Sequence, residues 1–344
     1  MGLSNEEVLK QSEGAMATWK NTWDKHAKIN GALYKKINKK HKDLLYKGIG
    51  KTLLCIASGP SLEKHIDELK NLSPAVEIAC VDKAMSDLIK NGIIPKYVIL
   101  ADAGIDYKQC CEPYIEHAKD MILLSNILGN PEWAQNWHDK GGEVFFYLNK
   151  DNIHTEERYA PMSGCKEVIP ASSNVSNALL VFATQILGFD KYLLLGYDYC
   201  WGDNEKYYAF NDGIKRYWMK HLQMLDMNGR MVDTSQNLLF SARWLTDFHN
   251  NFLRQKNIKV LNCSGQGILQ IPNGNLKKQL KNAKIRTLND ADRKFIYQAF
   301  VEKAVVTTPD VQADPNALNN TIEGLNVSEV HVFHLPKEVL HYLQ

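Results

Sequence analysis

Short apolar runs alternate with amphipathic stretches along the middle of the chain. The runs cover residues 52–58, 76–82, 97–102, 121–126, 143–149, 191–198 and 258–264. Helical spacing of apolar residues occurs between most of them, over residues 62–70, 83–91, 106–119, 174–187 and 236–255. Buried strands that alternate with helices are typical of a mostly parallel sheet with helices on both faces. The pattern therefore predicts an α/β, Rossmann-like fold.

Polar side chains stand at or beside the ends of these runs. They are Ser58, Asp82, Asp102, Asn126, Asn149, Asp198 and Asn262. In parallel α/β sheets, ligands bind outside the carboxyl ends of the strands. The polar ends therefore predict a binding site along this edge of the sheet.

The first run ends in the turn Ser58-Gly59-Pro60-Ser61, directly before a predicted helix. Ser61 is a suitable helix cap, and Gly59 would let a ligand approach the backbone closely. The amino end of a helix also offers unpaired N–H groups and a partial positive charge, which favour phosphate. The turn fits either a phosphate contact or a plain connection between strand and helix.

Two acidic residues, Asp82 and Asp102, end the second and third runs. Their carboxylates could hold ribose hydroxyls, a divalent cation that bridges phosphates, or an acceptor hydroxyl. Asp82 could instead cap the helix that follows it. Asp102 is the better functional candidate, because Ala103-Gly104 leaves space after it.

A second polar helix start, Ser172-Ser173-Asn174, precedes an apolar helix and could bind an anion or the edge of a base. A plain helix cap would need only one of these residues. Gly196 lies near the end of a later strand, where it would let a ligand approach, and Asp198 ends that strand. The loop 199–210 is rich in aromatic residues, which could stack on a base or sugar or could anchor the loop in the core.

Residues 1–48 are polar and helix-prone. Trp19, Trp23, His26 and Ile29 recur at helical spacing and would form one apolar stripe that docks on the core. Lysines then cluster between positions 35 and 47. Such a run is usually a solvated helix face, and the alternative is a contact with an anionic acceptor.

The alternating pattern weakens after about residue 275, where residues 290–304 predict a helix and residues 327–332 an edge strand. We therefore expect an N-terminal helical arm (1–48), a Rossmann-like catalytic domain that binds a nucleotide (49–275) and a small C-terminal appendage (276–344). The appendage would serve packing or self-association, the latter giving a homo-oligomer.

The composition is that of an ordinary globular chain, with 344 residues, 44% hydrophobic and 23% charged. A net charge of +2 provides no global field that would favour nucleic acid or a membrane as partner. The seven cysteines lack C-x-x-C spacing, which favours reduced thiols over disulfides or a zinc site. The polar first ten residues carry no signal-peptide core, and no apolar run is long enough to span a membrane. We therefore expect a cytoplasmic protein.

An ordered set of short motifs resembles one known family over roughly residues 50–270. The set comprises Ala57-Ser58-Gly59-Pro60-Ser61-Leu62, Val81-Asp82-Lys83-Ala84, Gly92-Ile93-Ile94-Pro95, Val98-Ile99-Leu100-Ala101-Asp102, Ser173-Asn174-Val175-Ser176-Asn177-Ala178, Leu187-Gly188-Phe189, Leu195-Gly196-Tyr197-Asp198, Val232-Asp233-Thr234 and Asn262-Cys263-Ser264-Gly265-Gln266-Gly267. It resembles the motility-associated-factor (Maf) glycosyltransferases and the related MptE-like 6-hydroxymethylpterin pyrophosphokinases. Part of it is also distantly similar to bacterial CMP-sialyltransferases.

The resemblance implies a nucleotide-sugar site. Its nucleotide-binding residues would be Ser58, Gly59, Pro60, Ser61, Asp82, Ser172, Ser173, Asn174 and Gly196. Contacts with the sugar or the acceptor would come from Asn126, Tyr208, Thr234 and Ser235. The sialyltransferases place a catalytic histidine in the segment that aligns with residues 229–235, which here contains none. The pterin kinases carry further acidic residues after the third strand, whereas here Ala-Gly-Ile separates Asp102 from Asp106, which favours the transferase.

We therefore expect a glycosyltransferase that moves a sugar from a nucleotide-activated donor to a hydroxyl acceptor, with a CMP-linked nonulosonic acid as one candidate donor. Asp102 is the first candidate for general base or metal ligand, and Asp198 is the second. The alternative is a Mg²⁺-dependent transfer of diphosphate from ATP to a small hydroxymethyl compound, with Asp82 and Asp102 as metal ligands. A second alternative is a non-catalytic nucleotide-binding or assembly protein on the same scaffold.

Overall fold

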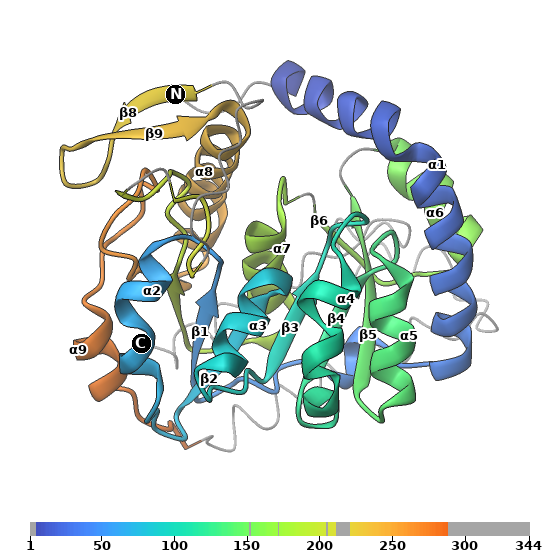
Figure 1. Ribbon diagram of the computed structural model, residues 1–344, viewed down its shortest axis with the longest axis horizontal. Coiled ribbons are helices and arrows are strands. Elements are labelled where there is room, and N and C mark those ends of the chain that lie inside the picture. The colour runs from blue at the N-terminus through green and yellow to red at the C-terminus, as the bar shows by residue number, and fades with distance from the viewer. Residues whose placement is uncertain (1–4, 151–152, 171, 204–205, 211–220, 288–344) are drawn as a thin grey trace, which may run out of the picture.

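The computed structural model describes residues 5–150, 153–170, 172–203, 206–210 and 221–287 (Figure 1). The helix expected over residues 290–304 and the edge strand expected over 327–332 lie outside the described residues. The three-part division of the chain stays a prediction.

An eight-stranded parallel sheet forms the centre of the fold. Its strands are β1 (Thr52–Ile56), β2 (Val76–Val81), β3 (Tyr97–Leu100), β4 (Ile122–Asn126), β5 (Glu143–Lys150), β6 (Val168–Pro170), β7 (Lys191–Leu195) and β10 (Lys259–Asn262). Every residue of β1, β3 and β4 is buried, as expected for strands that are covered on both faces. The α/β fold and the seven apolar strands that the sequence predicted are confirmed. The three-residue strand β6 was not predicted.

The strand order is β10-β7-β1-β2-β3-β4-β5-β6. The chain therefore builds the sheet outward from β1 to β6 and then returns to the other side of β1. Ile56 of β1 pairs in register with Cys80 of β2 and with Leu195 of β7, so these three strands end at one level. The order of the strands reverses between β1 and β7, which is where open α/β sheets place their ligand crevice.

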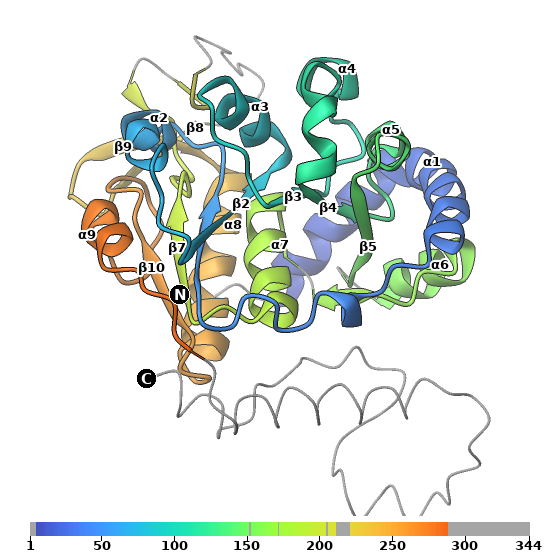
Figure 2. The ribbon, with the colours of Figure 1, turned by 90° about the horizontal axis from the view of Figure 1, so that it is seen from below.

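Helices cover both faces of the sheet (Figure 2). On one face lie α2 (Ser61–His65), α3 (Asp82–Lys90), α4 (Tyr107–Cys110) and α5 (Pro131–Asp139), and on the other lie α7 (Val175–Phe182) and α8 (Gln236–Phe248). Helical turns over Ile66–Leu69, Glu112–Asp120, Ala183–Leu187 and His249–Leu253 extend four of them. The five predicted core helices are thus confirmed. Helices α5, α6 (Ile153–Ser163) and α9 (Leu276–Lys281) were not predicted.

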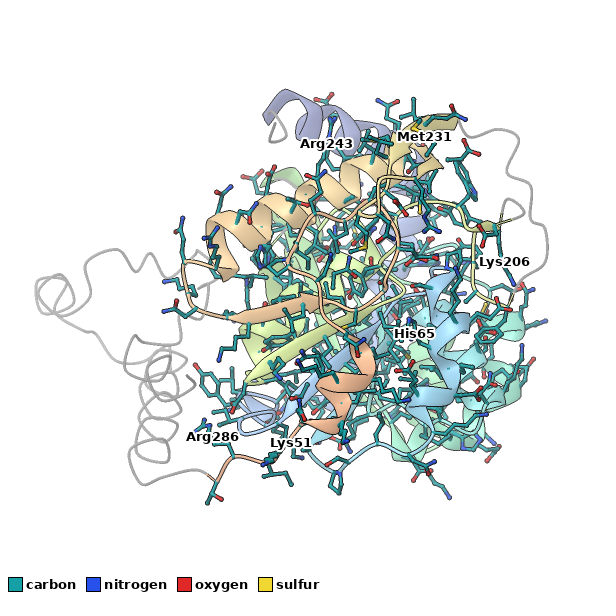
Figure 3. The ribbon with its side chains drawn as sticks, turned by 90° about the vertical axis from the view of Figure 1, so that its left-hand side faces the viewer. Lys51, His65, Lys206, Met231, Arg243 and Arg286 are labelled. Atoms are coloured by element: carbon teal, nitrogen blue, oxygen red, sulfur yellow. The ribbon has the colours of Figure 1, made fainter. Side chains whose placement is uncertain are left out.

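An antiparallel hairpin, β8 (His221–Leu225) and β9 (Met231–Ser235), lies outside the main sheet beside α8 (Figure 1). Its turn is held by Asp226, which accepts from the backbone N–H groups of Asn228 and Arg230 and from the Arg230 guanidinium. Figure 3 shows Met231 of this hairpin at one end of the molecule and Arg286 at the other. At that other end, Arg286 donates to Asp190 and thereby fastens the segment after α9.

The N-terminal arm is helical as predicted, because α1 spans Asn5–Ile37. Its buried face differs from the expected stripe. Ala27, Asn30 and Tyr34 are buried at helical spacing, whereas Ile29 is 42% exposed. The helix packs against α5 and α6, and the buried Asn30 amide donates to the carbonyls of residues 127 and 129. None of the described helices, α1 included, has the length and apolarity that a membrane span needs.

The lysine run lies at the amino edge of the sheet. Lys39 pairs at 2.9 Å with Glu143, the first residue of β5, and the Lys40 ammonium lies 3.6 Å from the centre of the Tyr34 ring. The lysines at positions 35, 36, 42 and 47 are exposed. Because ligands of such sheets bind at the opposite edge, this position fits a solvated surface and does not support a contact with an anionic acceptor.

Candidate functional site

A buried carboxylate, Asp198, holds the Gly-Pro-Ser turn. Its oxygens accept hydrogen bonds from the Ser61 backbone N–H (2.7 Å), the Ser61 hydroxyl (2.5 Å) and the Gln266 side-chain amide (3.0 Å). Burial raises the pKa of Asp198, and these hydrogen bonds oppose the rise. Ser61 begins α2, but its hydroxyl serves Asp198 and makes no capping bond. The catalytic role predicted for Asp198 stays a prediction, and the geometry fits a carboxylate that positions the turn.

The two glycines of this region let backbones touch. A Cβ on Gly59 would lie 2.4 Å from the Gly196 carbonyl oxygen and 3.0 Å from the Asp198 carboxylate. Gly196 has φ +77°, and a Cβ there would lie 2.2 Å from the Ala57 carbonyl oxygen. The interpretation that both glycines leave space for a ligand is therefore corrected, because the protein itself fills that space.

The amides at the start of α2 are also occupied. The backbone N–H of Gly59 donates to the Gly196 carbonyl, and that of Ser61 donates to the Asp198 carboxylate. The N–H groups of Leu62 and Glu63 donate to the carbonyls of Gly59 and Pro60. Pro60 is buried, and Ser58 is half-buried with its carbonyl bound to the Ala209 N–H. The backbone N–H groups of Gly59, Ser61, Leu62 and Glu63, which the sequence assigned to phosphate, thus have acceptors within the protein.

The amino end of α7 is less occupied. Asn174 caps the helix by accepting from the Asn177 N–H at 2.9 Å, as the sequence predicted. Ser173 accepts from the Asn177 side chain, and the buried Ser172 hydroxyl faces Asn149 at 3.4 Å. Within the described residues, the backbone N–H groups at positions 175 and 176 have no acceptor. The positive end of the helix dipole favours an anion at this position.

Asp82 and Asp102 form a carboxylate pair at the ends of β2 and β3. Asp82 is buried; its Oδ1 accepts from the Lys83 N–H at 2.8 Å, while its buried Oδ2 has no partner. Burial, together with the negative charge of Asp102, raises the pKa of Asp82 to about 7. Asp102 is exposed and accepts from the Gly104 N–H. A helix-capping bond would account for neither the burial of Asp82 nor its unpaired oxygen.

This pair fits a divalent cation of the Mg²⁺ type. Mg²⁺ takes oxygen ligands and is usually held by one or two carboxylates together with water and substrate phosphates. Among the described residues no cluster of three His, Cys, Asp or Glu side chains offers a fuller set of protein ligands. A cation here would therefore depend on the substrate to complete its coordination.

Lys83 belongs to the candidate site, and the sequence reasoning gave it no role. Its ammonium lies 3.2 Å from the Tyr208 hydroxyl and 4.3 Å from the centre of the Tyr208 ring. It forms no ion pair with any carboxylate of the described part of the chain. The signal was its place directly after the strand-end Asp82. Tyr208, predicted to touch the sugar or the acceptor, thus contacts the residue that follows Asp82 in the chain.

Three other predicted contacts serve the fold. Asn126 is buried and accepts from the Leu128 N–H, which shapes the loop after β4. The Thr234 hydroxyl donates to the Tyr199 carbonyl at 2.7 Å, and Ser235 caps α8. Thr234 and Ser235 are only 0% and 2% exposed. Their contact with a sugar or acceptor stays a prediction, and their burial and hydrogen bonds fit a structural role.

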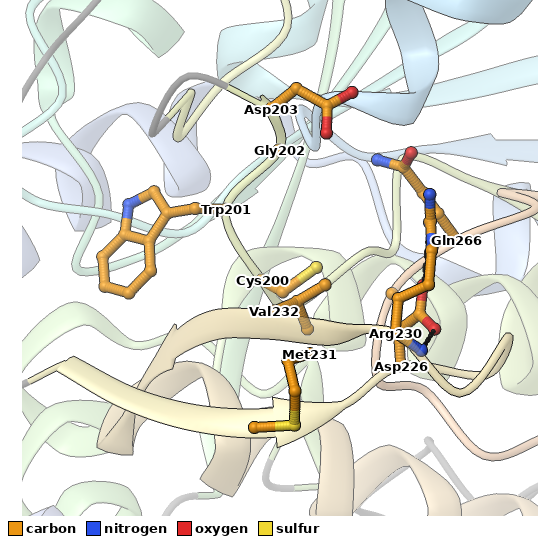
Figure 4. Close-up of a pocket in the computed structure, with 10 residues that line it drawn as sticks. Cys200, Trp201, Gly202, Asp203, Asp226, Arg230, Met231, Val232 and Gln266 are labelled. Atoms are coloured by element: carbon orange, nitrogen blue, oxygen red, sulfur yellow. Dashed lines mark hydrogen bonds and ion pairs between the residues drawn. The ribbon is translucent and has the colours of Figure 1, made fainter.

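A small cavity of about 100 Å³ lies between the hairpin and the loop after β7 (Figure 4). Arg230, paired with Asp226, and Gln266 line one side of it, and Cys200 lies opposite. Sites for small-molecule ligands usually measure about 300–1,000 Å³. A nucleotide does not fit this cavity, and the carboxylate pair with α7 remains the better candidate site.

Gly59→Ala is expected to lower the free energy of unfolding by roughly 1–3 kcal/mol, because the new methyl group would overlap the Gly196 carbonyl. Gly14→Ala is the matched control, since nothing lies within 4 Å of a Cβ at this exposed helical position. It should stabilise the chain by about 0.5–1 kcal/mol. Urea unfolding of both variants measures the difference. An unchanged urea midpoint for Gly59→Ala would indicate that the space beside Gly59 is open to a ligand.

Asp82 should make stability depend on pH. Its folded pKa of about 7 lies above the ~3.9 of an unfolded aspartate, so the folded state binds the extra proton between these values. The free energy of unfolding should therefore decrease as pH rises from about 4 through 7. Asp82→Asn should remove this decrease, while Asp120→Asn, at an exposed position, should keep it. Thermal unfolding at pH 5 and pH 8 tests this.

Mg²⁺ should raise the Tm of the unchanged chain more at pH 8 than at pH 5, because a metal needs the ionised carboxylate. The same scans with Asp82→Asn should show no such gain. A gain that survives Asp82→Asn would place the metal elsewhere.

Comparisons with known proteins identify the family and the fold. A family model described as 6-hydroxymethylpterin diphosphokinase MptE-like matches residues 21–204, which contain β1 to β7, the carboxylate pair and the start of α7. A search of curated proteins finds no match. Among solved structures, the Maf glycosyltransferase from Magnetospirillum magneticum AMB-1 shares the fold with a TM-score of 0.54 at 16% sequence identity. The similarity covers 82% of this chain and only 42% of that one. Since the family model accounts for more than half of the chain, this protein belongs to the MptE-like family.

Proposed function

We propose that this chain is a transferase that moves a sugar from a nucleotide-activated donor to a hydroxyl acceptor. The observation that carries the proposal is the exposed Asp102 beside the buried Asp82, whose Oδ2 lacks a partner. The amino end of α7 and the Lys83 ammonium, which pairs with no carboxylate of the described residues, add the positive charge that a donor phosphate needs. The name of the Maf glycosyltransferase, which shares the fold, agrees with this chemistry.

In this proposal Asp102 removes the proton of the acceptor hydroxyl as that oxygen attacks the sugar. Exposure leaves the Asp102 carboxylate accessible to an acceptor. The bond from the sugar to the donor phosphate breaks, and the α7 amides and Lys83 stabilise the negative charge on the departing phosphate. A divalent cation bound at Asp82 would supply further positive charge to the phosphates.

The second candidate is the transfer of diphosphate from ATP to a hydroxymethyl compound. The family description, 6-hydroxymethylpterin diphosphokinase MptE-like, favours it. In that reaction Asp82 and Asp102 would together hold Mg²⁺, and a carboxylate pair of this kind suits phosphate transfer. The two candidates use one site and differ in the nucleotide and in the role of Asp102.

Nucleotide preference separates the candidates. We expect CMP or UDP to bind more tightly than ATP in calorimetric titrations of CMP, UDP, GDP and ATP, each with and without Mg²⁺. Tight binding of ATP with Mg²⁺, and none of CMP or UDP, would favour the diphosphokinase. Binding of none of the four would contradict both candidates.

Asp102→Asn should lower turnover by roughly 10²–10⁴-fold, as expected for the loss of a general base. Nucleotide affinity should stay within several-fold, because the phosphate contacts assigned to α7 and Lys83 are intact. Steady-state kinetics and calorimetry on the same preparation provide both numbers, and Asp120→Asn serves as control. If turnover survives while Mg²⁺-dependent nucleotide binding disappears, Asp102 is a metal ligand and the base lies elsewhere.

A further inference from the structure

The first half of α1 reaches the carboxyl edge of the sheet (Figure 1). There the tip of the Trp19 indole lies against the loop after β3. A Cβ on Gly104 would lie 2.8 Å from Cη2 of Trp19 and 3.5 Å from Oδ1 of Asp102. Glycine at position 104 thus lets an indole from the N-terminal helix approach the carboxylate of the candidate base.

The Trp19 indole is free to meet a ligand. The side chain is only half-buried, and its Nε1–H has no acceptor within the residues that the structure describes. Trp23, one turn further along α1, differs because it packs edge-on against Tyr159 at 6.2 Å. An aromatic ring with an unused N–H donor beside a reactive polar group is typical of small-molecule sites.

Trp19 stands on the acceptor side of the site. The groups proposed to bind the sugar donor are Lys83 with Tyr208 and the start of α7. They lie toward β1 and β7, where the strand order reverses, since Tyr197 and Tyr199 after β7 bind the first turn of α7. The indole instead lies beyond Asp102, at the end of β3. A base at Asp102 would therefore have the donor on one side and Trp19 on the other.

We propose that Trp19 binds the ring of the acceptor and holds its hydroxyl at Asp102. This inference rests on the proposed function, in which Asp102 faces an acceptor hydroxyl. The acceptor would be a ring compound with an apolar face, either a sugar ring or a planar heteroaromatic ring. The ring stacks on the indole, and Nε1–H donates to an oxygen or nitrogen of the acceptor.

Fluorine NMR of protein labelled with 5-fluorotryptophan tests the contact directly. The chain has seven tryptophans, and Trp19→Phe and Trp23→Phe identify two of the resonances. The probes are methyl β-D-glucopyranoside for a sugar ring and 3-hydroxymethylpyridine for a heteroaromatic ring, with open-chain sorbitol as control. We expect at least one ring compound to shift the Trp19 resonance, while sorbitol leaves it in place and the Trp23 resonance does not move.

Variants then measure the effect on affinity. Trp19→Ala should raise the Kd of the ring compound at least tenfold, Trp19→Phe should raise it less, and both should keep nucleotide affinity within twofold. Trp23→Phe, which also removes an indole from α1, should leave the Kd of the ring compound unchanged. Thermal unfolding shows that each variant is folded.

Three results would overturn the inference. The first is a Trp19 resonance that neither ring compound moves, and the second is an equal shift of that resonance with sorbitol. The third is a nucleotide affinity that Trp19→Ala weakens tenfold, which would assign Trp19 to the nucleobase of the donor. Failure of the proposed function would appear separately, as an unmodified chain that binds none of the four nucleotides in calorimetry.

Discussion

The hydrogen bonds of the Asp198 carboxylate join the three strands on which the rest of the site depends. Asp198 follows β7, Ser61 follows β1, and Gln266 follows β10, so one buried side chain connects the ends of three neighbouring strands. A buried carboxylate is costly unless donors surround it, and removing one donor leaves that cost uncompensated. The close approach at Gly59 and Gly196 and the start of α2 follow from this arrangement.

The backbone N–H groups at the start of α2 bond within the protein, so the ligand chemistry that we propose lies further along the same edge of the sheet. Within the part of the chain that the structure describes, one buried oxygen of Asp82 and two amides of α7 have no hydrogen-bond partner, and Lys83 contacts an aromatic ring but no carboxylate. These groups complement one another, since a cation, a phosphate and a hydroxyl acceptor would each find partners among them. In the candidate site, the polar groups near β1 and β7 are thus bonded to one another, whereas an oxygen of Asp82 at the end of β2 has no partner among the described residues.

The main elements were predictable where burial alone decides them. Short apolar runs such as that of β1, which ends in a Gly-Pro turn, favour strands covered on both faces, and Asn174 could be recognised as a cap from the apolar helix behind it. The roles of single residues were harder to predict from the sequence. A glycine such as Gly59 looks the same whether a ligand or another backbone fills the space beside it. The burial of Thr234 depends on a hairpin packed against a distant loop, and no local pattern shows such a contact.

The placement of β7 beside β1 has a consequence for synthesis and folding. Ser61 and Asp198 are separated by 137 residues, so the central strand acquires its second neighbour only after most of the chain exists. Until then β1 is an open edge, with unpaired backbone groups and a continuous apolar sequence that favour association with other chains. Contacts between such distant residues also slow folding, because a long loop must close before they form. The interval between the synthesis of β1 and that of β7 is therefore when the nascent chain is most exposed to aggregation.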